Sequence, residues 1–253
     1  ETLEKALNVP VLAVIGEHKP LRKLRPTKVS WVMSNHEGKP LPIELAQIGL
    51  TGLEQNLWKT CADFVRERKS SRILVTGTER GCGTSVLAAS IAVNLARHLR
   101  YPTVLLGTDF MSPSLATYCG VPGEPGLADV MGGSTELKYA LHSAPGLAEL
   151  SVLPSGGKRV SLAGEFAGEA FKMALSQLSG SAKVVLIDSP PIVTEASTTA
   201  LLDSVDAVIL VTRARVSLKE DVEEARSRIE GAGVHFLGAV LNRFRPEFSR
   251  SIG

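Results

Sequence analysis

The sequence ILVTGTERGCGTS, at residues 73–85, contains the pattern that decides the fold. A β-branched apolar run leads into a glycine-rich turn, and a helical pattern begins at Ser85. This order is typical of a phosphate-binding loop, in which backbone N–H groups and the positive end of a helix dipole converge on an anion. Such loops carry a lysine directly before the final serine or threonine, and here that position is Thr84. The sequence therefore keeps the backbone cradle but lacks its side-chain charge.

Apolar runs alternate with helical patterns from residue 71 onward, and the runs are nearly continuous, as in strands buried on both faces. The predicted strands are 72–77, 103–109, 150–155, 183–191, 207–213 and 235–244. The predicted helices are 85–99, 165–178, 196–203 and 217–231, the last opening with a capping box of Ser217 and Glu220. This alternation predicts an α/β fold, a doubly wound and mainly parallel sheet with helices on both faces, of the P-loop NTPase type.

The first part of the chain has a different character. Residues 1–15 predict a short helix and a strand, a basic and proline-rich linker follows, and an amphipathic helix resumes over 44–69. The linker is either a solvated connection or a contact for anionic lipid. We therefore expect two parts, a juxtamembrane-type segment with its linker at 1–45 and a P-loop kinase/ATPase-like domain at 46–253.

Composition limits the possible classes of protein. The 253 residues are 44% hydrophobic, which allows one large core, and the formal net charge of +2 gives no argument for a nucleic-acid partner. The three cysteines lack metal-ligand spacing, and their odd number argues against a disulfide framework and favours a reducing compartment. No apolar run reaches the roughly 18 residues that span a bilayer. Because the chain begins at Glu1, we expect it to be a piece of a longer protein.

Two carboxylates end predicted strands, where doubly wound sheets bind their ligands. Asp188 ends the run KVVLID, and Asp109 ends TVLLGTD. Each is either an ordinary turn aspartate or a group that positions the attacking atom and, together with the Ser85 hydroxyl, holds Mg²⁺. We predict Asp109 and Asp188 as the catalytic residues if the protein is active, and Ser85, Asp109 and Asp188 as the Mg²⁺ ligands if nucleotide binds.

The predicted nucleotide contacts are Thr78, Arg80, Gly81, Cys82, Gly83, Thr84, Ser85, Asn242 and Arg243. Arg80 either replaces the missing lysine charge or is a solvated arginine. Cys82 is either a redox-sensitive thiol at a helix N-terminus or an incidental small side chain. Asn242 and Arg243 follow the last apolar run and either contact a base edge or end the strand. A nicotinamide site with Asp109 on a ribose is disfavoured, because GTERGCG lacks the third glycine at the required interval.

Together these motifs resemble the bacterial tyrosine kinase (BY-kinase) domains of polysaccharide co-polymerases, which fall within the deviant P-loop ATPases that include partitioning and septum-site proteins. The resemblance rests on ETLEKALNVPVLAVI at 1–15, on residues 103–131 with their Pro-Gly-Leu-x-Asp-Val sequence, on residues 183–217, which begin KVVLIDSPPIVTEAS, and on GAVLNRF at 238–244. It implies ATP or ADP with Mg²⁺ as ligands. It also implies a membrane-embedded part of the same protein and the polysaccharide assembly machinery as partners, a homo-oligomer, and a location at the cytoplasmic face of the inner membrane.

The chain departs from the family pattern mainly where the family carries charge. The resemblance implies a lysine, an aspartate and an arginine at positions occupied here by Thr84, Gly107 and Met111-Ser112. The positions that match the family's charged oligomerisation motif are Ile48, Thr51 and Glu54. The family's C-terminal tyrosine cluster is missing, since the tyrosines are Tyr101, Tyr118 and Tyr139.

These departures favour a pseudokinase, a kinase-like domain of exopolysaccharide or capsule biosynthesis with weak or no ATP turnover and with nucleotide binding weakened or lost. Losing one positioned charge costs about 10²–10³ in rate. Losing one charged hydrogen bond costs about 1.5–3 kcal/mol of binding. Two alternatives stay open: an active ATP-dependent tyrosine autokinase in which Arg80 or a partner supplies the charge, and a partitioning-type ATPase switch.

Overall fold

An eight-stranded sheet forms the centre of the part of the chain that the computed structural model describes, residues 10–16, 55–157 and 164–244. Its strand order is β1-β8-β7-β2-β6-β3-β5-β4, and every pair is parallel except β4 with β5. The strands are β1 (Val11–Gly16), β2 (Ser71–Gly77), β3 (Thr103–Gly107), β4 (His142–Ser143), β5 (Leu150–Leu153), β6 (Val184–Asp188), β7 (Ala207–Arg213) and β8 (His235–Phe244).

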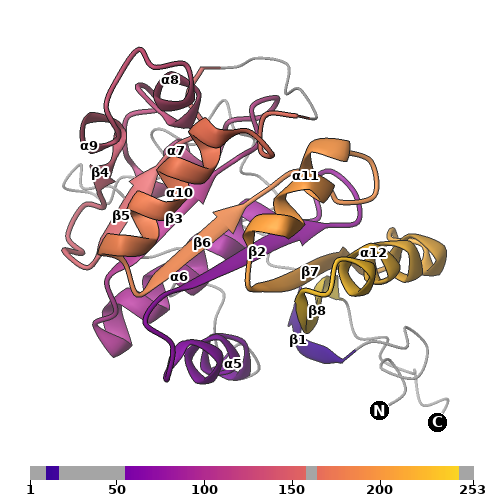
Figure 1. Ribbon diagram of the computed structural model, residues 1–253. Coiled ribbons are helices and arrows are strands. Elements are labelled where there is room, and N and C mark those ends of the chain that lie inside the picture. Colours follow the sequence, from indigo (N-terminus) through magenta and orange to yellow (C-terminus); the bar gives the residue numbers. More distant parts are fainter. Residues whose placement is uncertain (1–9, 17–54, 158–163, 245–253) are drawn as a thin grey trace, which may run out of the picture.

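Helices cover both faces of this sheet, with α10, α11 and α12 in front of it and α6 behind it in Figure 1. One face packs against α5 (Gln55–Val65), α6 (Thr84–Leu99) and α7 (Leu115–Cys119). The other packs against α8 (Leu127–Met131), α9 (Leu137–Ala140), α10 (Glu169–Ser181), α11 (Ala196–Leu201) with the 3₁₀ turn η2 (Leu202–Ser204), and α12 (Lys219–Gly231). The fold is thus the doubly wound α/β fold that the sequence predicts.

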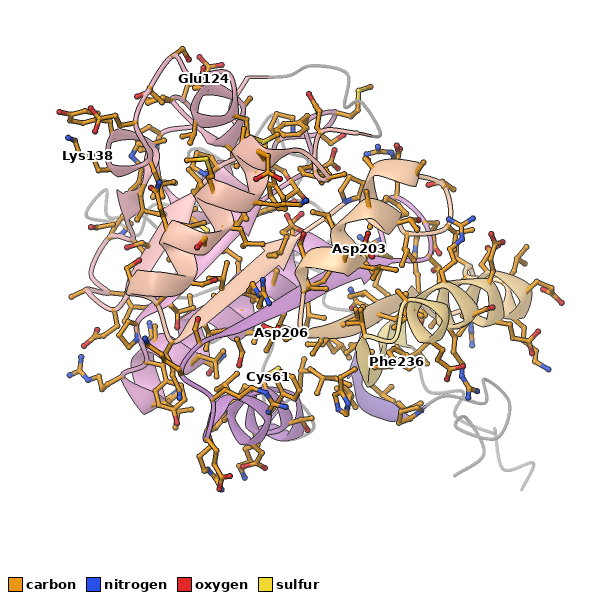
Figure 2. All side chains as sticks on the ribbon, in the orientation of Figure 1. Cys61, Glu124, Lys138, Asp203, Asp206 and Phe236 are labelled. Carbon is orange, nitrogen blue, oxygen red and sulfur yellow. The ribbon has the colours of Figure 1, made fainter. Side chains whose placement is uncertain are left out.

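Side chains alternate between the two cores along each central strand, because successive residues of a strand point to opposite faces. In β6, Val184 and Leu186 join the cluster under α5 and α6, whereas Val185 and Ile187 join the cluster under α10, α11 and α12. All four side chains are fully buried. On the first face, Cys61 of α5 points toward the sheet and is also fully buried (Figure 2). The continuous apolar run in the sequence therefore corresponds to a strand covered on both sides.

The strands and helices predicted from residue 71 onward exist, but several of their ends are wrong. β3 and β6 stop at Gly107 and Asp188, so the residues after these positions form connections rather than strand. The predicted capping box of Ser217 and Glu220 is also wrong. α12 begins at Lys219 without a side-chain cap, and the Ser217 hydroxyl instead accepts the N–H of Arg213 at 2.7 Å.

The first strand joins the same sheet as the P-loop domain. β1 pairs with β8, and the N–H of Ala239 donates to the carbonyl of Pro10 at 2.7 Å. The predicted division at residue 45, the predicted helix before β1 and the positions Ile48, Thr51 and Glu54 lie outside the described residues. Within the described residues no helix is both long and apolar enough to cross a bilayer.

The connection between β3 and β5 contains short elements that have no clear sequence pattern, namely α7, α8, α9 and β4. Backbone hydrogen bonds fix α8, since Leu127 and Ala128 donate to the carbonyls of Pro154 and Ser155 at 2.8 and 2.9 Å. Gly126 permits this close approach. A Cβ at position 126 would lie 2.3 Å from the nitrogen of Gly156 and 2.6 Å from the oxygen of Pro154.

We therefore expect Gly126→Ala to lower the free energy of unfolding by about 1–3 kcal/mol, because backbone would have to move to admit the methyl group. Gly180→Ala is the matched control, since Gly180 lies in α10 with open space around its Cα. There the same methyl group should raise stability by about 0.5–1 kcal/mol. Urea unfolding of both variants measures the difference. Equal stability of Gly126→Ala and the parent would contradict the close docking of α8.

Candidate nucleotide-binding site

The strand order brings three predicted site segments to one edge of the sheet. β6 lies between β2 and β3, and Asp188 is in register with Val75 of β2 and with Gly107 of β3. The loop that follows β2, the carboxylate of Asp188 and the turn that holds Asp109 therefore meet at the carboxyl ends of neighbouring strands. This is the position at which parallel α/β sheets bind ligands.

The loop after β2 has the backbone shape of an anion cradle. Gly81 and Gly83 have φ values of 81° and 102°, a left-handed region that side chains other than glycine rarely adopt. Gly83 is the N-cap of α6 and has no side chain with which to cap the first turn. The positive end of a sixteen-residue helix thus faces the loop.

Cys82 lies beneath the loop rather than in the cradle. Its side chain is 1% exposed and belongs to the core cluster under α6. Its Sγ lies 3.1 Å from the hydroxyl oxygen of Thr84, so the Thr84 side chain is turned toward the core side of the loop. Burial raises the pKa of the Cys82 thiol. The hypothesis of an activated thiol with a lowered pKa is therefore wrong.

Asn242 fastens the loop to β8. Its side-chain amide donates to the carbonyl of Cys82 at 2.7 Å, and its Oδ1 accepts the N–H of Arg243 at 2.8 Å. A Cβ on Gly83 would lie only 2.3 Å from this amide nitrogen, so glycine is required there for space as well as for φ. Asn242 and Arg243 lie within β8 rather than after it. A base contact by these residues stays a prediction.

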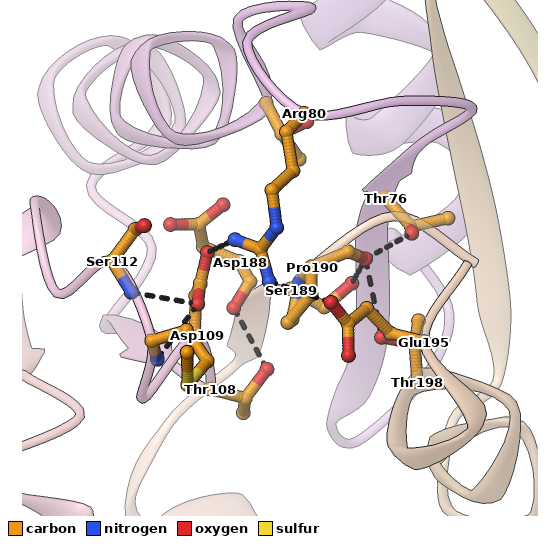
Figure 3. A network of polar contacts seen from close by, with 12 residues as sticks. Thr76, Arg80, Thr108, Asp109, Ser112, Asp188, Ser189, Pro190, Glu195 and Thr198 are labelled. Atoms are coloured by element: carbon orange, nitrogen blue, oxygen red, sulfur yellow. Dashed lines mark hydrogen bonds and ion pairs between the residues drawn. The ribbon is translucent and has the colours of Figure 1, made fainter. Parts of the chain in front are cut away.

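Arg80 reaches from the loop across the end of β6, as Figure 3 shows. Its Nη1 donates to Oδ2 of Asp109 at 3.0 Å, and its Nη2 donates to Oε1 of Glu195 at 2.6 Å. The Arg80 side chain is 42% exposed, yet two carboxylates hold its charge. Arg80 is therefore an exposed arginine that is nevertheless ion-paired, and a cation is present at the site although position 84 provides none. A role for Arg80 in place of the lysine stays a prediction.

Asp109 is a turn aspartate as well as an acid of the site. Its Oδ1 accepts the backbone N–H groups of Met111 and Ser112, both at 3.0 Å, while Oδ2 pairs with Arg80. Two residues earlier, Gly107 is tightly packed. A Cβ there would lie 3.1 Å from the nitrogen of Ser155 and about as close to Leu115, so an aspartate at 107 would have to displace its neighbours.

Asp188 is the most constrained group of the site. The residue is 3% exposed, and its Oδ1 has no hydrogen-bond partner. Burial raises the pKa of Asp188 to about 7; a hydrogen bond from Ser85 opposes this shift, and the nearby carboxylate of Asp109 adds to it. Its backbone carbonyl accepts both the N–H and the hydroxyl of Thr108, each at 2.9 Å.

These oxygens fit a magnesium ion. The unpartnered Oδ1 of Asp188, the hydroxyl of Ser85 and the carboxylate of Asp109 are the hard donors that Mg²⁺ prefers, and Mg²⁺ takes few protein ligands beside phosphate and water. No cluster of three or more His, Cys, Asp or Glu side chains suited to a metal occurs within 10–16, 55–157 and 164–244. The site therefore suits a cation that nucleotide phosphates help to bind.

The proline-containing turn after β6 is held firmly. The carbonyl of Pro190 accepts the hydroxyls of Thr76 at 2.8 Å and Thr198 at 3.1 Å, contacts that Figure 3 also draws. The N–H of Ser189 donates to Val75. The stiffness expected of this turn therefore comes from cross-strand hydrogen bonds in addition to the proline rings.

Three residues of the site were not predicted from the sequence as site residues. Glu195 is one, because it lies 115 residues from Arg80 along the chain. Glu79 and Ser217 are the others. The Ser217 hydroxyl donates to Glu79 at 2.7 Å, and the Thr78 hydroxyl also donates to Glu79. These contacts tie the start of the loop to the β7–α12 connection, and only the fold brings these residues together.

The pKa of Asp188 predicts a pH dependence of stability. A carboxyl whose pKa is raised from 3.8 to about 7 keeps its proton in the folded state after the unfolded chain has lost it. Its contribution to stability is therefore complete below about pH 4 and is lost as the pH rises toward 7. In chelator and without nucleotide, we expect Asp188→Asn to be more stable than the parent at pH 8, by about 1–3 kcal/mol, and to lose this advantage at pH 4.

Urea unfolding across this pH range measures the effect. The control variant is Asp203→Asn, which removes the same charge at an exposed position of η2 (Figure 2). Parallel pH profiles for Asp188→Asn and the parent would show that burial of the Asp188 carboxylate does not penalise its charge.

Comparisons with known proteins identify relatives of the chain and of its fold. No model of a protein family matches the chain. Tyrosine-protein kinase CpsD of Streptococcus agalactiae serotype III is 26% identical over 177 residues, which cover 69% of this chain and 75% of the relative. Tyrosine-protein kinase Wzc of Salmonella typhi is 23% identical over 188 residues, which cover 74% of this chain but only 25% of the relative. The chain thus spans about a quarter of its longer relatives.

Solved structures resemble the fold over most of the chain. The kinase domain of Escherichia coli tyrosine kinase ETK superposes with a TM-score of 0.77 at 18% identity, covering 100% of this chain and 98% of that chain. The septum site-determining protein MinD of Pyrococcus horikoshii OT3, complexed with Mg-ADP, has a TM-score of 0.59 at 23% identity over 70% of this chain and 72% of that chain. The homologues of this chain are therefore bacterial tyrosine kinases, and its fold is that of BY-kinase domains and MinD-like P-loop ATPases.

Proposed function

We propose that the chain is the kinase-like domain of a capsule or exopolysaccharide biosynthesis protein, and that it is a pseudokinase that binds Mg-nucleotide weakly and turns over little or no ATP. The tyrosine-protein kinases among its relatives support the kinase-like part of this proposal. The altered loop supports the loss of activity. The observation that carries it is an anion cradle of normal backbone shape in which the Thr84 hydroxyl contacts Cys82 and brings no charge to the phosphate position.

Different groups of the site would bind the phosphates and the metal ion. The N–H groups of the loop and of the first turn of α6 would hold the phosphates. Ser85, Asp109 and Asp188 would hold Mg²⁺, which when bound neutralises phosphate charge. Without the lysine, binding should be weaker by about 1.5–3 kcal/mol, or roughly ten- to a hundredfold. The tight packing around Gly107 supports the same conclusion, because it leaves little room for the second acid of an active motif.

A second candidate function, an active tyrosine autokinase, is favoured by one specific contact. Arg80 places a guanidinium against Asp109, at the edge of the sheet where phosphate would lie. A positioned arginine can stabilise a transferring phosphoryl group. In that case Asp109→Asn and Asp188→Asn should each abolish a measurable phosphate release.

The proposed location and partners of the domain follow from the resemblance to BY-kinase domains, because the geometry of the site does not bear on them. We propose that it acts at the cytoplasmic face of the inner membrane, next to a membrane-embedded part of the same protein and the polysaccharide assembly machinery. We also propose that it forms a homo-oligomer and has no nucleic-acid partner. Of the chain's three tyrosines, Tyr139 is 62% exposed on α9 and the other two are more buried, so Tyr139 is the most accessible phosphoacceptor.

Calorimetric titration with Mg-ADP tests whether the missing lysine at position 84 weakens nucleotide binding. We expect Thr84→Lys to bind Mg-ADP about ten- to a hundredfold more tightly than the parent, because a lysine restores a charge on the phosphates. Gln177→Lys, at an exposed position of α10, is the control for added positive charge. If Thr84→Lys binds no more tightly than Gln177→Lys, loss of the lysine does not explain weak binding.

Phosphate release from Mg-ATP tests the lack of turnover. We expect the parent to release phosphate at no more than about one hundredth of the rate of an active kinase domain such as that of ETK, since each lost charge costs about 10²–10³. Robust release or phosphotyrosine in the purified parent would contradict the pseudokinase proposal. It would support the autokinase if the two aspartate variants are inactive.

A further inference from the structure

Glu195 is the N-cap residue of α11. Its side chain makes no capping hydrogen bond, and its carboxylate instead accepts the guanidinium of Arg80 at 2.6 Å. Its backbone is fixed, because its N–H donates to Pro191 and its carbonyl accepts the N–H of Thr198. A firmly held acid therefore points across the site toward the cation of the loop.

We infer, on the basis of the proposed nucleotide site, that Glu195 restrains Arg80 and competes with nucleotide phosphate for its guanidinium. Arg80 would be the phosphate-binding cation of this altered loop, and Glu195 the residue that sets how much of its charge is available. Binding would then require an exchange, in which the guanidinium leaves the Glu195 carboxylate and donates to a phosphate oxygen.

The charges at the site support this exchange. Asp109 and Glu195 hold the Arg80 guanidinium between two carboxylates, and Asp188 is a third acid that interacts with Asp109. Arg80 is the one cation among the residues labelled in Figure 3. A phosphate in the cradle would add a further anion to this group, and Arg80 is attached to the cradle through its own backbone. A guanidinium has five N–H donors and prefers paired oxygens, so phosphate and carboxylate are equivalent partners in geometry.

Glu195 and Asp109 differ in what else they hold. Asp109 also accepts two backbone N–H groups and is a candidate Mg²⁺ ligand, so replacing it would disturb the turn and the metal as well. The Glu195 side chain pairs with Arg80, and it makes no hydrogen bond to the first turn of α11. Its replacement therefore isolates the restraint on Arg80.

The pair is partly exposed, with 42% of the Arg80 side chain and 32% of the Glu195 side chain accessible, so its effect should be modest. We expect Glu195→Gln to bind Mg-ADP about three- to fivefold more tightly than the parent, measured by calorimetry on the 253-residue chain. Arg80→Gln should bind at least about tenfold more weakly. In the Arg80→Gln background, Glu195→Gln should change the affinity by less than about twofold, because no guanidinium is left to release.

Two further variants guard against misleading results. Glu223→Gln removes the same charge from an exposed pair with Lys219 on α12, and its affinity should match that of the parent. Glu195→Ala should show the same gain in affinity for Mg-ADP as Glu195→Gln. It replaces Glu195→Gln in the experiment if thermal unfolding shows that Glu195→Gln does not fold.

The outcomes separate this inference from the proposed function. Suppose that Thr84→Lys tightens the binding of Mg-ADP but Glu195→Gln and Glu195→Ala bind it no more tightly than the parent. The inference that Glu195 restrains Arg80 is then wrong, and the proposed nucleotide site is supported. A gain that persists in the Arg80→Gln background would also overturn the restraint, since it would come from simple removal of negative charge. If none of these proteins binds Mg-ADP, Thr84→Lys included, both the nucleotide site and the restraint are wrong.

Discussion

The burial of β6 between β2 and β3 sets the position of each acid at the candidate site. Because Asp188 is in register with Val75 and Gly107, the loop after β2 and the turn after β3 must flank it on either side. The apolar residues of β6 are fully buried in two different cores, so a shift of register by one residue would move every side chain into the opposite core and disrupt the packing of both. The cradle, the two aspartates and the arginine that pairs with Asp109 all depend on that packing.

The site is built at a cost to stability. A carboxyl buried with one unpartnered oxygen is an unfavourable element of a core, and its raised pKa shows the penalty that burial puts on its charge. Sites of this kind are where proteins depart from well-satisfied packing, because a ligand supplies the missing partner. The acid at position 188 and the ion pairs of Arg80 describe a polar pocket in which position 84 carries no charge.

The sequence was sufficient for the fold and for the backbone shape of the loop after β2. Continuous Val/Ile/Leu runs identify strands covered on both faces, and Gly81 and Gly83 identify the cradle, because both are local properties. Strand ends were less accurate, since hydrophobicity does not show where Asp109 starts a turn. The five-residue helices α7 and α8 are too short to display a period. The pairing of Arg80 with Glu195 depends on the folded arrangement of distant segments and has no local signature.

The tie between Asn242 and the carbonyl of Cys82 has a consequence for how distant parts of the chain communicate. β1 lies alongside β8, β8 carries Asn242, and the amide of Asn242 holds the middle of the glycine turn. One strand and a single side chain therefore separate the N-terminal strand from the place where an anion would be received. Tension or displacement applied to β1 has a short mechanical path to that turn, through the backbone of β8 and the amide of Asn242.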